Sequence, residues 1–357
     1  MRVNCHKDIV SFHDQEVTLP ESERSDMRRR RDANRDRLKR GLKSVGKPAP
    51  IQFRSQGSYA MRTMVQQPDK DYDIDDGVVF PIESLRGPRA AAMTPGTAKT
   101  MVRDALDDQR FSKAPESRTN CVRIYYQAGY HVDMPVYRCV PSQGHSGALA
   151  GRYELASTDW KPSDPHAVTL WFHKANKRRS PDLSNGGQMR RIVRLLKAFA
   201  RSRSWWRDRI ASGFMISALV VECYQAHPNR DDRALYETVR RIHDRLCHNL
   251  EILHPVIRGT TLTTGPDDAK TRFLRAKLEW ALQQLEDLLR FSCTREQALG
   301  AWDRMFKVGF FSARPGREGR REDQAGLAAL TTAPTLGKRS TDRPSMPVDY
   351  RGDRRYA

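Results

Sequence analysis

The 357-residue sequence predicts an α/β fold, in which a lobe with a mixed β-sheet is followed by a helical lobe. Three observations lead to this prediction. Between residues 50 and 140, short runs of alternating apolar and polar residues are bounded by glycine and proline, as in half-buried strands. From about residue 190, apolar residues recur at every third or fourth position, as in amphipathic helices. Residues 312–357 are rich in Arg, Gly, Pro and Thr and poor in large apolar residues, which predicts a disordered basic tail.

The first half is predicted to alternate helices and strands. Residues 20–45 should form a long helix, and a strand over residues 51–57 should lead into a short helix from Ser58. A second strand follows at Tyr72–Phe80. The segment "TPGTAKTMVRDALDDQ" predicts a helix, and "CVRIYYQAGYHVDMPVYRCV" predicts two strands joined at Gly129.

The second half is predicted to be helical. The segment "MRRIVRLLKAFARS" is amphipathic, whereas "SGFMISALVVECYQAH" is apolar nearly all round and should lie at the centre of its lobe. Further helices are expected at about 231–250, 267–291 and 294–307. We therefore expect an N-terminal helix and a sheet-containing core in residues 1–185, a helical lobe in 186–311 and the tail in 312–357.

Composition limits the classes of function. The net charge of +20 predicts a polyanionic partner, either nucleic acid or nucleotide phosphates. No stretch has the roughly 18 to 20 consecutive apolar residues of a membrane span, so we expect a soluble, cytoplasmic protein that does not bind membranes. The six cysteines form neither a CxxC pair nor a zinc-ligand pattern with histidine, so they are expected to be reduced thiols.

A cluster of aspartates interrupts the second strand, in "DYDIDDGVVF". Successive side chains of a strand face opposite sides, so Asp73 and Asp75 share one face. In "GYHVDMPVY", Asp133 lies on the polar side of another strand, and Pro135 places that segment at a sheet edge or a strand end. Three such carboxylates can hold two divalent cations about 3.5 to 4 Å apart for in-line phosphoryl transfer. A solvated turn is the simpler interpretation of the aspartates, and Asp76 should point away from Asp75.

A Gly-Ser pair precedes the aspartates, between a strand and the start of a helix. Backbone amides, the Ser58 hydroxyl and the positive end of the helix dipole suit a triphosphate there. A simple helix cap is the alternative for this pair.

These segments resemble a known family. "QGSYAMRT", "DYDIDDGVVFP" and "YHVDMPVY" occur in the order found in the nucleotidyltransferase core of the DNA polymerase β-like enzymes. Within that superfamily the sequence is similar to the bacterial CD-NTases, the cGAS/DncV-like nucleotidyltransferases, and above all to the DncV-like cyclic GMP-AMP synthases of CBASS anti-phage defence. The resemblance covers roughly residues 20–310 and is most specific over 52–140. It implies a DNA polymerase β-like nucleotidyltransferase lobe with a mixed sheet, joined to a helical C-terminal lobe.

The resemblance also implies the metal site. Asp73 and Asp75 would bind two metal ions, Mg²⁺ or Mn²⁺. Asp133 would complete the metal site and help to activate the attacking hydroxyl group.

Five further residues are implied to bind nucleotide. Gln56, Gly57 and Ser58 would line the donor triphosphate. Lys197 in "RLLKAFARS" and Ser212 in "ASGFMISALVVECY" are similar to the phosphate-binding lysine and serine of the family. For these two residues, an exposed lysine and a helix N-cap serine remain alternatives.

The resemblance implies a metal-dependent nucleotidyltransferase that makes a purine cyclic dinucleotide second messenger, cyclic GMP-AMP, from ATP and GTP. Its partners would be a downstream effector that the cyclic nucleotide activates and an E1/E2-like protein that conjugates the C-terminal carboxylate of Ala357. A dispensable tail is the alternative for that end. The zinc insertion with which animal cyclic GMP-AMP synthases grip DNA is missing from the sequence, so no obligatory DNA is expected.

Two other functions remain open on the sequence alone. A template-independent polymerase-type nucleotidyltransferase acting on RNA or oligoadenylate would use the same three carboxylates. A non-catalytic RNA-binding module would use the basic faces and would not need Asp73.

Overall fold

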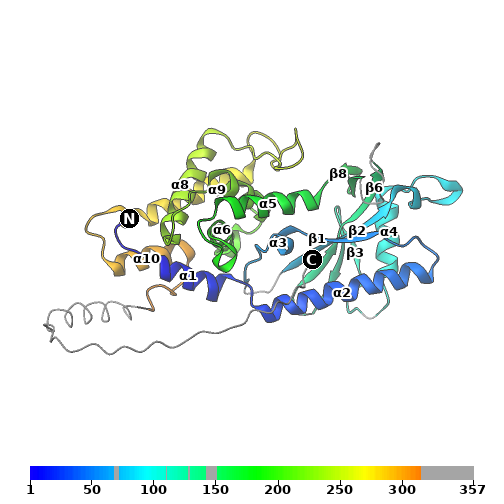
Figure 1. Cartoon of the computed structure of the whole chain (residues 1–357), viewed down its shortest axis with the longest axis horizontal. Coiled ribbons are helices and arrows are strands. Elements are labelled where there is room, and N and C mark those ends of the chain that lie inside the picture. Colours follow the sequence, from blue (N-terminus) through cyan, green and yellow to red (C-terminus); the bar gives the residue numbers. More distant parts are fainter. Residues whose placement is uncertain (68–71, 110, 128, 142–150, 315–357) are drawn as a thin grey trace, which may run out of the picture. The chain divides into compact units, whose positions relative to one another are not determined.

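Figure 1 shows the computed structural model, which describes residues 1–67, 72–109, 111–127, 129–141 and 151–314. The chain divides into two compact units, Met1–Ala313 and Arg314–Ala357. Only Arg314 of the second unit is described. The predicted tail of residues 312–357 therefore lies almost wholly outside the described residues, as does the candidate conjugation residue Ala357.

A mixed β-sheet forms the centre of the first lobe. Among the described residues it has eight strands, in the order β3-β4-β5-β2-β6-β7-β8, with β1 paired to β2. Strand β2 is parallel to β5 and β6 and antiparallel to β1, which makes the sheet mixed as predicted. The strands are β1 (Gln52–Gln56), β2 (Asp73–Pro81), β3 (Glu116–Ser117), β4 (Val122–Tyr125), β5 (His131–Met134), β6 (Val136–Pro141), β7 (Gly151–Ala156) and β8 (Trp160–Pro162).

Two helices cover the sheet lobe, α2 (Glu21–Ser44) and α4 (Pro95–Leu106). In Figure 1 the long α2 runs beside the sheet. Leu38 and Leu42 of α2 share one buried apolar cluster with α4 and with the strands. Gly41 permits the close approach of the two helices, because a Cβ atom at this position would overlap the backbone carbonyl of Ala105 in α4. The two helices are therefore closely packed on each other and on the sheet that carries the aspartates.

The second lobe is a cluster of helices around a separate apolar core. α7 lies in this core, and its residues 215–220 are buried, as the apolar sequence predicts. The helices are α1 (His6–Phe12), α5 (Pro165–Arg179), α6 (Gln188–Arg201), α7 (Gly213–Cys223), α8 (Asp231–His248), α9 (Ala269–Gln284) and α10 (Arg295–Phe306). Short helical segments are η1 (His13–Val17), η2 (Ile82–Ser84), η3 (Pro88–Ala90), η4 (Ser184–Gly186), η5 (Ser204–Trp206) and η6 (Glu286–Leu289), and α3 (Gly57–Ala60) follows β1.

The N-terminal segment belongs to the core of the helical lobe. Ile9 and Phe12 of α1 are buried in the same cluster as the helices of the second half, and Figure 1 places α1 next to α10. The ring of Phe12 lies 4.7 Å from that of Phe306 in α10. Residues 1–17 therefore pack with the helical lobe, although they precede the sheet in the sequence. The boundary that we predict between residues 185 and 186 stays a prediction, since residues 1–313 form one unit.

Most of the predicted elements are present, and one segment differs. "CVRIYYQAGYHVDMPVYRCV" forms three strands, β4, β5 and β6, instead of two. Pro135 separates β5 from β6, because it has no N–H group to donate to the sheet, although its carbonyl accepts from the N–H of Val78 at 2.8 Å. Pro135 thus lies at a strand end in the interior of the sheet and not at an edge.

Among the described residues, none of the helices combines the length and the apolar character needed to cross a bilayer. All six cysteines are free thiols, as the sequence predicts.

Candidate active site

The register of two parallel strands, β2 and β5, brings the predicted carboxylates together. In the parallel pair of β2 and β5, Asp73 lies opposite His131 and Asp75 lies opposite Asp133. Residues paired in this way project from the same face of a sheet, and so do residues two apart in one strand. The three aspartates and His131 therefore share one face of the sheet at the N-terminal end of β2. The alternation in the sequence predicts this for the aspartates.

Oxygen and nitrogen atoms of this cluster are close enough to share a cation. One ligand atom from each of Asp73, His131 and Asp133 lies within 4.8 Å of the others. Two carboxylates and an imidazole form a donor set that Mg²⁺ or Mn²⁺ accepts, with the imidazole nitrogen the softer donor. The donor chemistry thus fits the predicted metal site, and Asp75 adds a third carboxylate on the same face.

The electrostatics of Asp75 show an excess of negative charge. Burial raises the pKa of this carboxyl well above its ordinary value, and the charges of Asp73 and Asp133 raise it further. Arg123 acts in the opposite direction and lowers the pKa of Asp75. A divalent cation on this face would balance the carboxylates, so the unbalanced charge is a second observation that fits metal binding.

Asp133 is paired with Arg123, a residue that the sequence reasoning missed. Arg123 Nε donates to Asp133 Oδ1 at 2.8 Å and Nη2 donates to Oδ2 at 2.7 Å. The two residues lie opposite each other in the antiparallel pair of β4 and β5. In the hairpin that joins these strands, the N–H of Tyr126 donates to the carbonyl of Tyr130 at 3.1 Å, and the same register three residues further pairs Arg123 with Asp133.

The turn after β1 brings Gln56, Gly57 and Ser58 beside the aspartates. Gln56 pairs with Asp75 across the antiparallel β1 and β2, and its Oε1 accepts from the hydroxyl of Tyr137 at 3.1 Å. Gly57 has a φ of +64°, which favours glycine, and a Cβ atom there would overlap Oδ2 of Asp75. The predicted Gly-Ser turn therefore touches the predicted metal site directly.

Lys197 and Ser212 reach the same place from the helical lobe. Lys197 is 4% exposed, and its Nζ donates to Oγ1 of Thr63 at 2.9 Å, so the alternative of an exposed lysine is wrong. Burial lowers the pKa of Lys197 to about 7, Arg201 adds to this effect and Asp73 opposes it. Ser212 is the N-cap of α7, since its side chain accepts from the N–H of Met215 at 3.2 Å.

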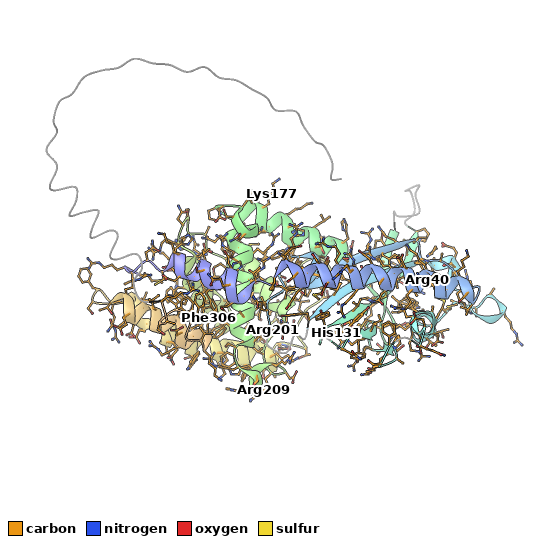
Figure 2. The ribbon with its side chains drawn as sticks, turned by 90° about the horizontal axis from the view of Figure 1, so that it is seen from below. Arg40, His131, Lys177, Arg201, Arg209 and Phe306 are labelled. Atoms are coloured by element: carbon orange, nitrogen blue, oxygen red, sulfur yellow. The ribbon has the colours of Figure 1, made fainter. Side chains whose placement is uncertain are left out.

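Two cavities meet at this cluster. The first, of about 350 Å³, is lined by every predicted site residue in the described chain except Asp133. The second, of about 340 Å³, is lined by basic side chains from both lobes, which are Arg123, Lys197, Arg201, Arg207 and Lys270. Asp73, Lys197 and Ser212 line both cavities. Figure 2 shows His131 of β5 and Arg201 of α6 next to each other in the middle of the molecule, and both line the second cavity.

Other polar or aromatic residues of these segments have structural roles. Asp76 is fully buried and points away from Asp75, as predicted, and Arg35 Nε and Nη2 each donate to it at 2.6 Å. Trp206 is 2% exposed and packs against Phe199, whereas Trp205 is 55% exposed. Of the tryptophan pair, at least Trp206 therefore serves packing.

The fold and the carboxylate cluster define a class of protein. A mixed sheet with acidic residues on two parallel strands, a Gly-Ser turn beside them and a helical lobe behind is the architecture of a nucleotidyltransferase. Residues 51–137 match the family described as cyclic GMP-AMP synthase DncV-like, nucleotidyltransferase domain. This match over residues 51–137 agrees with the resemblance found in the sequence.

Most of the chain is also similar to solved structures of this type. The DncV cyclic AMP-GMP synthase of Vibrio cholerae, in complex with a linear intermediate, matches with a TM-score of 0.65 and 17% identity over 85% of this chain and 95% of that chain. DncV of Escherichia coli, with bound 3'-deoxy GTP, matches with a TM-score of 0.62 and 18% identity over 82% and 92% of the two chains. The CD-NTase CdnG of Bradyrhizobium diazoefficiens, in complex with GTP, matches with a TM-score of 0.63 and 16% identity over 85% of this chain and 97% of that chain. At these identities the likeness establishes the fold.

Proposed function

We propose that this protein is a cyclic-dinucleotide synthase that makes cyclic GMP-AMP from ATP and GTP as a second messenger in anti-phage defence. The observation that carries the proposal is the meeting of two cavities of similar volume at one carboxylate cluster. Joining two nucleotides requires two nucleotide sites that share one reaction centre. The structural neighbours include a cyclic AMP-GMP synthase bound to the linear intermediate pppA(3',5')pG.

The first cavity suits the donor nucleotide. Ser58 and Ser212 contribute hydroxyl groups to its wall, and Lys197 contributes an amine close to Asp73. Phosphate oxygens would accept hydrogen bonds from all three side chains. We assign Gln56 and Gly57 to the same cavity, where the missing side chain of Gly57 leaves the carboxylate of Asp75 accessible.

The second cavity suits the acceptor nucleotide. Its basic side chains come from β4, α6, the segment before α7 and α9, so the positive charge surrounds the space from several sides. A triphosphate is the complementary ligand for such a wall. Asp73 lies in both walls, so the hydroxyl of one bound nucleotide would lie near the phosphate of the other.

The chemistry at the junction is the displacement of pyrophosphate by a ribose hydroxyl, carried out twice. Asp73, Asp75 and Asp133 would hold two divalent cations, which would lower the pKa of the attacking hydroxyl and offset charge on the transferring phosphate. Lys197 and Ser58 would orient the leaving pyrophosphate. Asp133 would help to accept the hydroxyl proton at a carboxylate oxygen. The linear dinucleotide would then turn in the site and close into a ring by the same steps.

The experiment that tests this function uses the purified full chain and labelled nucleoside triphosphates, with Mg²⁺ or Mn²⁺. A product that resists phosphatase and has the mass of cyclic GMP-AMP supports the proposal. Linear oligonucleotides or extended RNA would instead indicate a polymerase-type enzyme. Absence of any product, together with RNA binding that weakens steeply with salt and does not need Asp73, would indicate an RNA-binding module.

A second arm of the experiment tests activation. We propose that synthesis needs no polynucleotide, so nuclease-treated protein should make product at an undiminished rate. Strict dependence on added DNA or RNA would contradict this part of the proposal. The product would act on an effector that binds cyclic nucleotides.

A further inference from the structure

Arg123 occupies both oxygens of a carboxylate that the metal site needs. Its two hydrogen bonds to Asp133, at 2.8 and 2.7 Å, form a bidentate pair between neighbouring strands. The side chain of Asp133 is 8% exposed and that of Arg123 is 24% exposed. A guanidinium in this arrangement neutralises Asp133 and fixes its orientation.

The same carboxylate lies within cation-sharing distance of Asp73 and His131. A divalent cation bound to Asp133 would repel the guanidinium that holds the same group, because both carry positive charge. The ion pair and the metal therefore compete for Asp133. Metal binding must weaken the contact between Arg123 and Asp133, and that contact must in turn weaken metal binding.

The second cavity offers Arg123 another partner. Arg123 lines this cavity together with Arg201, Arg207 and Lys270. A long, partly exposed arginine side chain can rotate away from Asp133 without movement of the strand. Phosphate oxygens in the cavity would accept the same two parallel hydrogen bonds that the carboxylate accepts now.

We propose that Arg123 is a nucleotide-binding residue with two alternative partners, Asp133 before the metal binds and a phosphate of the acceptor nucleotide afterwards. This inference rests on the proposed function, because it assigns the second cavity to a nucleotide. Metal and acceptor nucleotide then bind cooperatively. The metal takes Asp133 and leaves Arg123 available for the phosphate, and the phosphate takes Arg123 and leaves Asp133 available for the metal. Arg123 keeps the cluster partly neutral in the protein without metal and adds positive charge to the acceptor site once metal is present.

The test compares the full chain with its Arg123→Gln and Arg123→Lys variants. A matched control is Arg138→Gln, since Arg138 also pairs with a carboxylate on a neighbouring strand, Nε to Oε2 of Glu154 at 2.6 Å, and lines neither cavity. Mn²⁺ binding is measured without nucleotide by electron paramagnetic resonance. Binding of the non-transferable ATP analogue with an α,β-methylene group is measured with and without Mn²⁺, because the adenosine nucleotide is the acceptor in the intermediate pppA(3',5')pG.

Arg123→Gln is expected to bind Mn²⁺ about tenfold to 100-fold more tightly than the unaltered chain, the size of one hydrogen bond to a charged group. The same variant should bind the ATP analogue more weakly in the presence of Mn²⁺ and should lose most of the cooperativity. Arg123→Lys should be intermediate in both measurements, and Arg138→Gln should be unchanged.

Unchanged or weaker Mn²⁺ binding by Arg123→Gln would overturn the inference, because a merely structural salt bridge predicts that result. Equal binding of the ATP analogue by the variant and the unaltered chain would overturn it as well. The Mn²⁺ titration involves no turnover, so it decides the competition at Asp133 even if the protein makes no cyclic product. Failure of the proposed function would instead appear only in the product assay.

Discussion

Gly57 and Asp75 are so close that a methyl group on Gly57 would overlap a carboxylate oxygen of Asp75. Gly57 also has a φ of +64°, a conformation that costs other residues about 1 to 2 kcal/mol. We predict that Gly57→Ala lowers the free energy of unfolding by this modest amount and abolishes product formation, since the side chain must displace Asp75. Chemical denaturation and the nucleotide assay measure the two effects separately.

Gly46 provides the matched control for this prediction. Its φ is +62°, but a Cβ atom there would meet no atom within 4 Å. Gly46→Ala should therefore lose a similar amount of stability and keep its activity. Equal loss of activity in both variants would show that backbone strain and not the contact with Asp75 is responsible.

The double variant with Asp73→Asn and Asp75→Asn is expected to lose at least about 100-fold of its activity while the protein stays folded. Residues that only form hydrogen bonds to metal ligands already change metal affinity or activity by up to about 100-fold when they are replaced.

Asp75→Asn alone should raise stability at pH 8 without metal. The pKa of Asp75 is raised in the folded protein, so its ionised form is unfavourable there and the folded state binds the extra proton as the pH falls. The gain over the unaltered chain should therefore shrink toward acid pH. Denaturation at several pH values checks the sign.

Asp76→Asn distinguishes the catalytic face from the structural face of the same strand. Asp76 is buried and holds Arg35 through two hydrogen bonds, so its loss should cost about 2 to 3 kcal/mol of stability. A stabilised and inactive Asp75→Asn beside a destabilised Asp76→Asn is the expected pattern. Destabilisation of the Asp75 variant at pH 8 would contradict the assignment of excess negative charge to the cluster.

The sequence alone predicts which strand face each of the three carboxylates lies on, because the alternation of side chains along a strand is a local property. Asp73 and Asp75 are two residues apart, and Asp133 alternates with Val132 and Met134, so each face could be assigned before the register was known. The partner Arg123 depends on the exact register of the hairpin, which a turn placed at Gly129 does not give. The second cavity could not be predicted in this way, since Lys270 reaches it from a helix far along the chain.

Two helices were missed for physical reasons. α5 buries only Phe172, Ala175 and Asn176, so its apolar periodicity is weak, although Asp164 caps its N-terminus and Pro165 begins it. α1 has seven residues and contributes mainly Ile9 and Phe12 to a core formed by distant helices. Such a segment is helical because of its tertiary packing, which the local sequence does not encode.

Because His131 lies in the cluster, we predict that the site prefers Mn²⁺ to Mg²⁺. Its imidazole lies with Asp73 and Asp133 in the cluster, and a nitrogen donor favours Mn²⁺ over Mg²⁺, which prefers oxygen ligands. His131→Asn should weaken Mn²⁺ binding by at least about tenfold relative to Mg²⁺. Competition between the two ions, followed by electron paramagnetic resonance of Mn²⁺, measures the ratio. His166→Asn, at an exposed residue that lines neither cavity, serves as the control, and an equal ratio in both variants would remove His131 from the metal site.

We predict that the amine of Lys197 takes up a proton when nucleotide binds. Burial lowers its pKa to about 7 from an ordinary value of 10.5, so at pH 8 the amine is mostly neutral in the free protein. A triphosphate beside it favours the charged form and raises the pKa of Lys197 again. Binding of an ATP analogue with an α,β-methylene group should therefore take up a proton at pH 8 and much less at pH 6. Calorimetry in buffers of different ionisation enthalpy measures the uptake.

The Lys197→Met variant supplies the control for the proton uptake and a second readout. Between pH 7 and 10.5 the unfolded state of the unaltered chain binds the proton that the folded state releases, so its stability without nucleotide should rise with pH across this range. Methionine cannot titrate, so the rise of stability with pH should be smaller in Lys197→Met. The proton uptake that accompanies binding of the analogue at pH 8 should disappear in this variant. The same uptake in both proteins would show that another group takes up the proton, and Lys197 would then lose its assignment to the phosphate site.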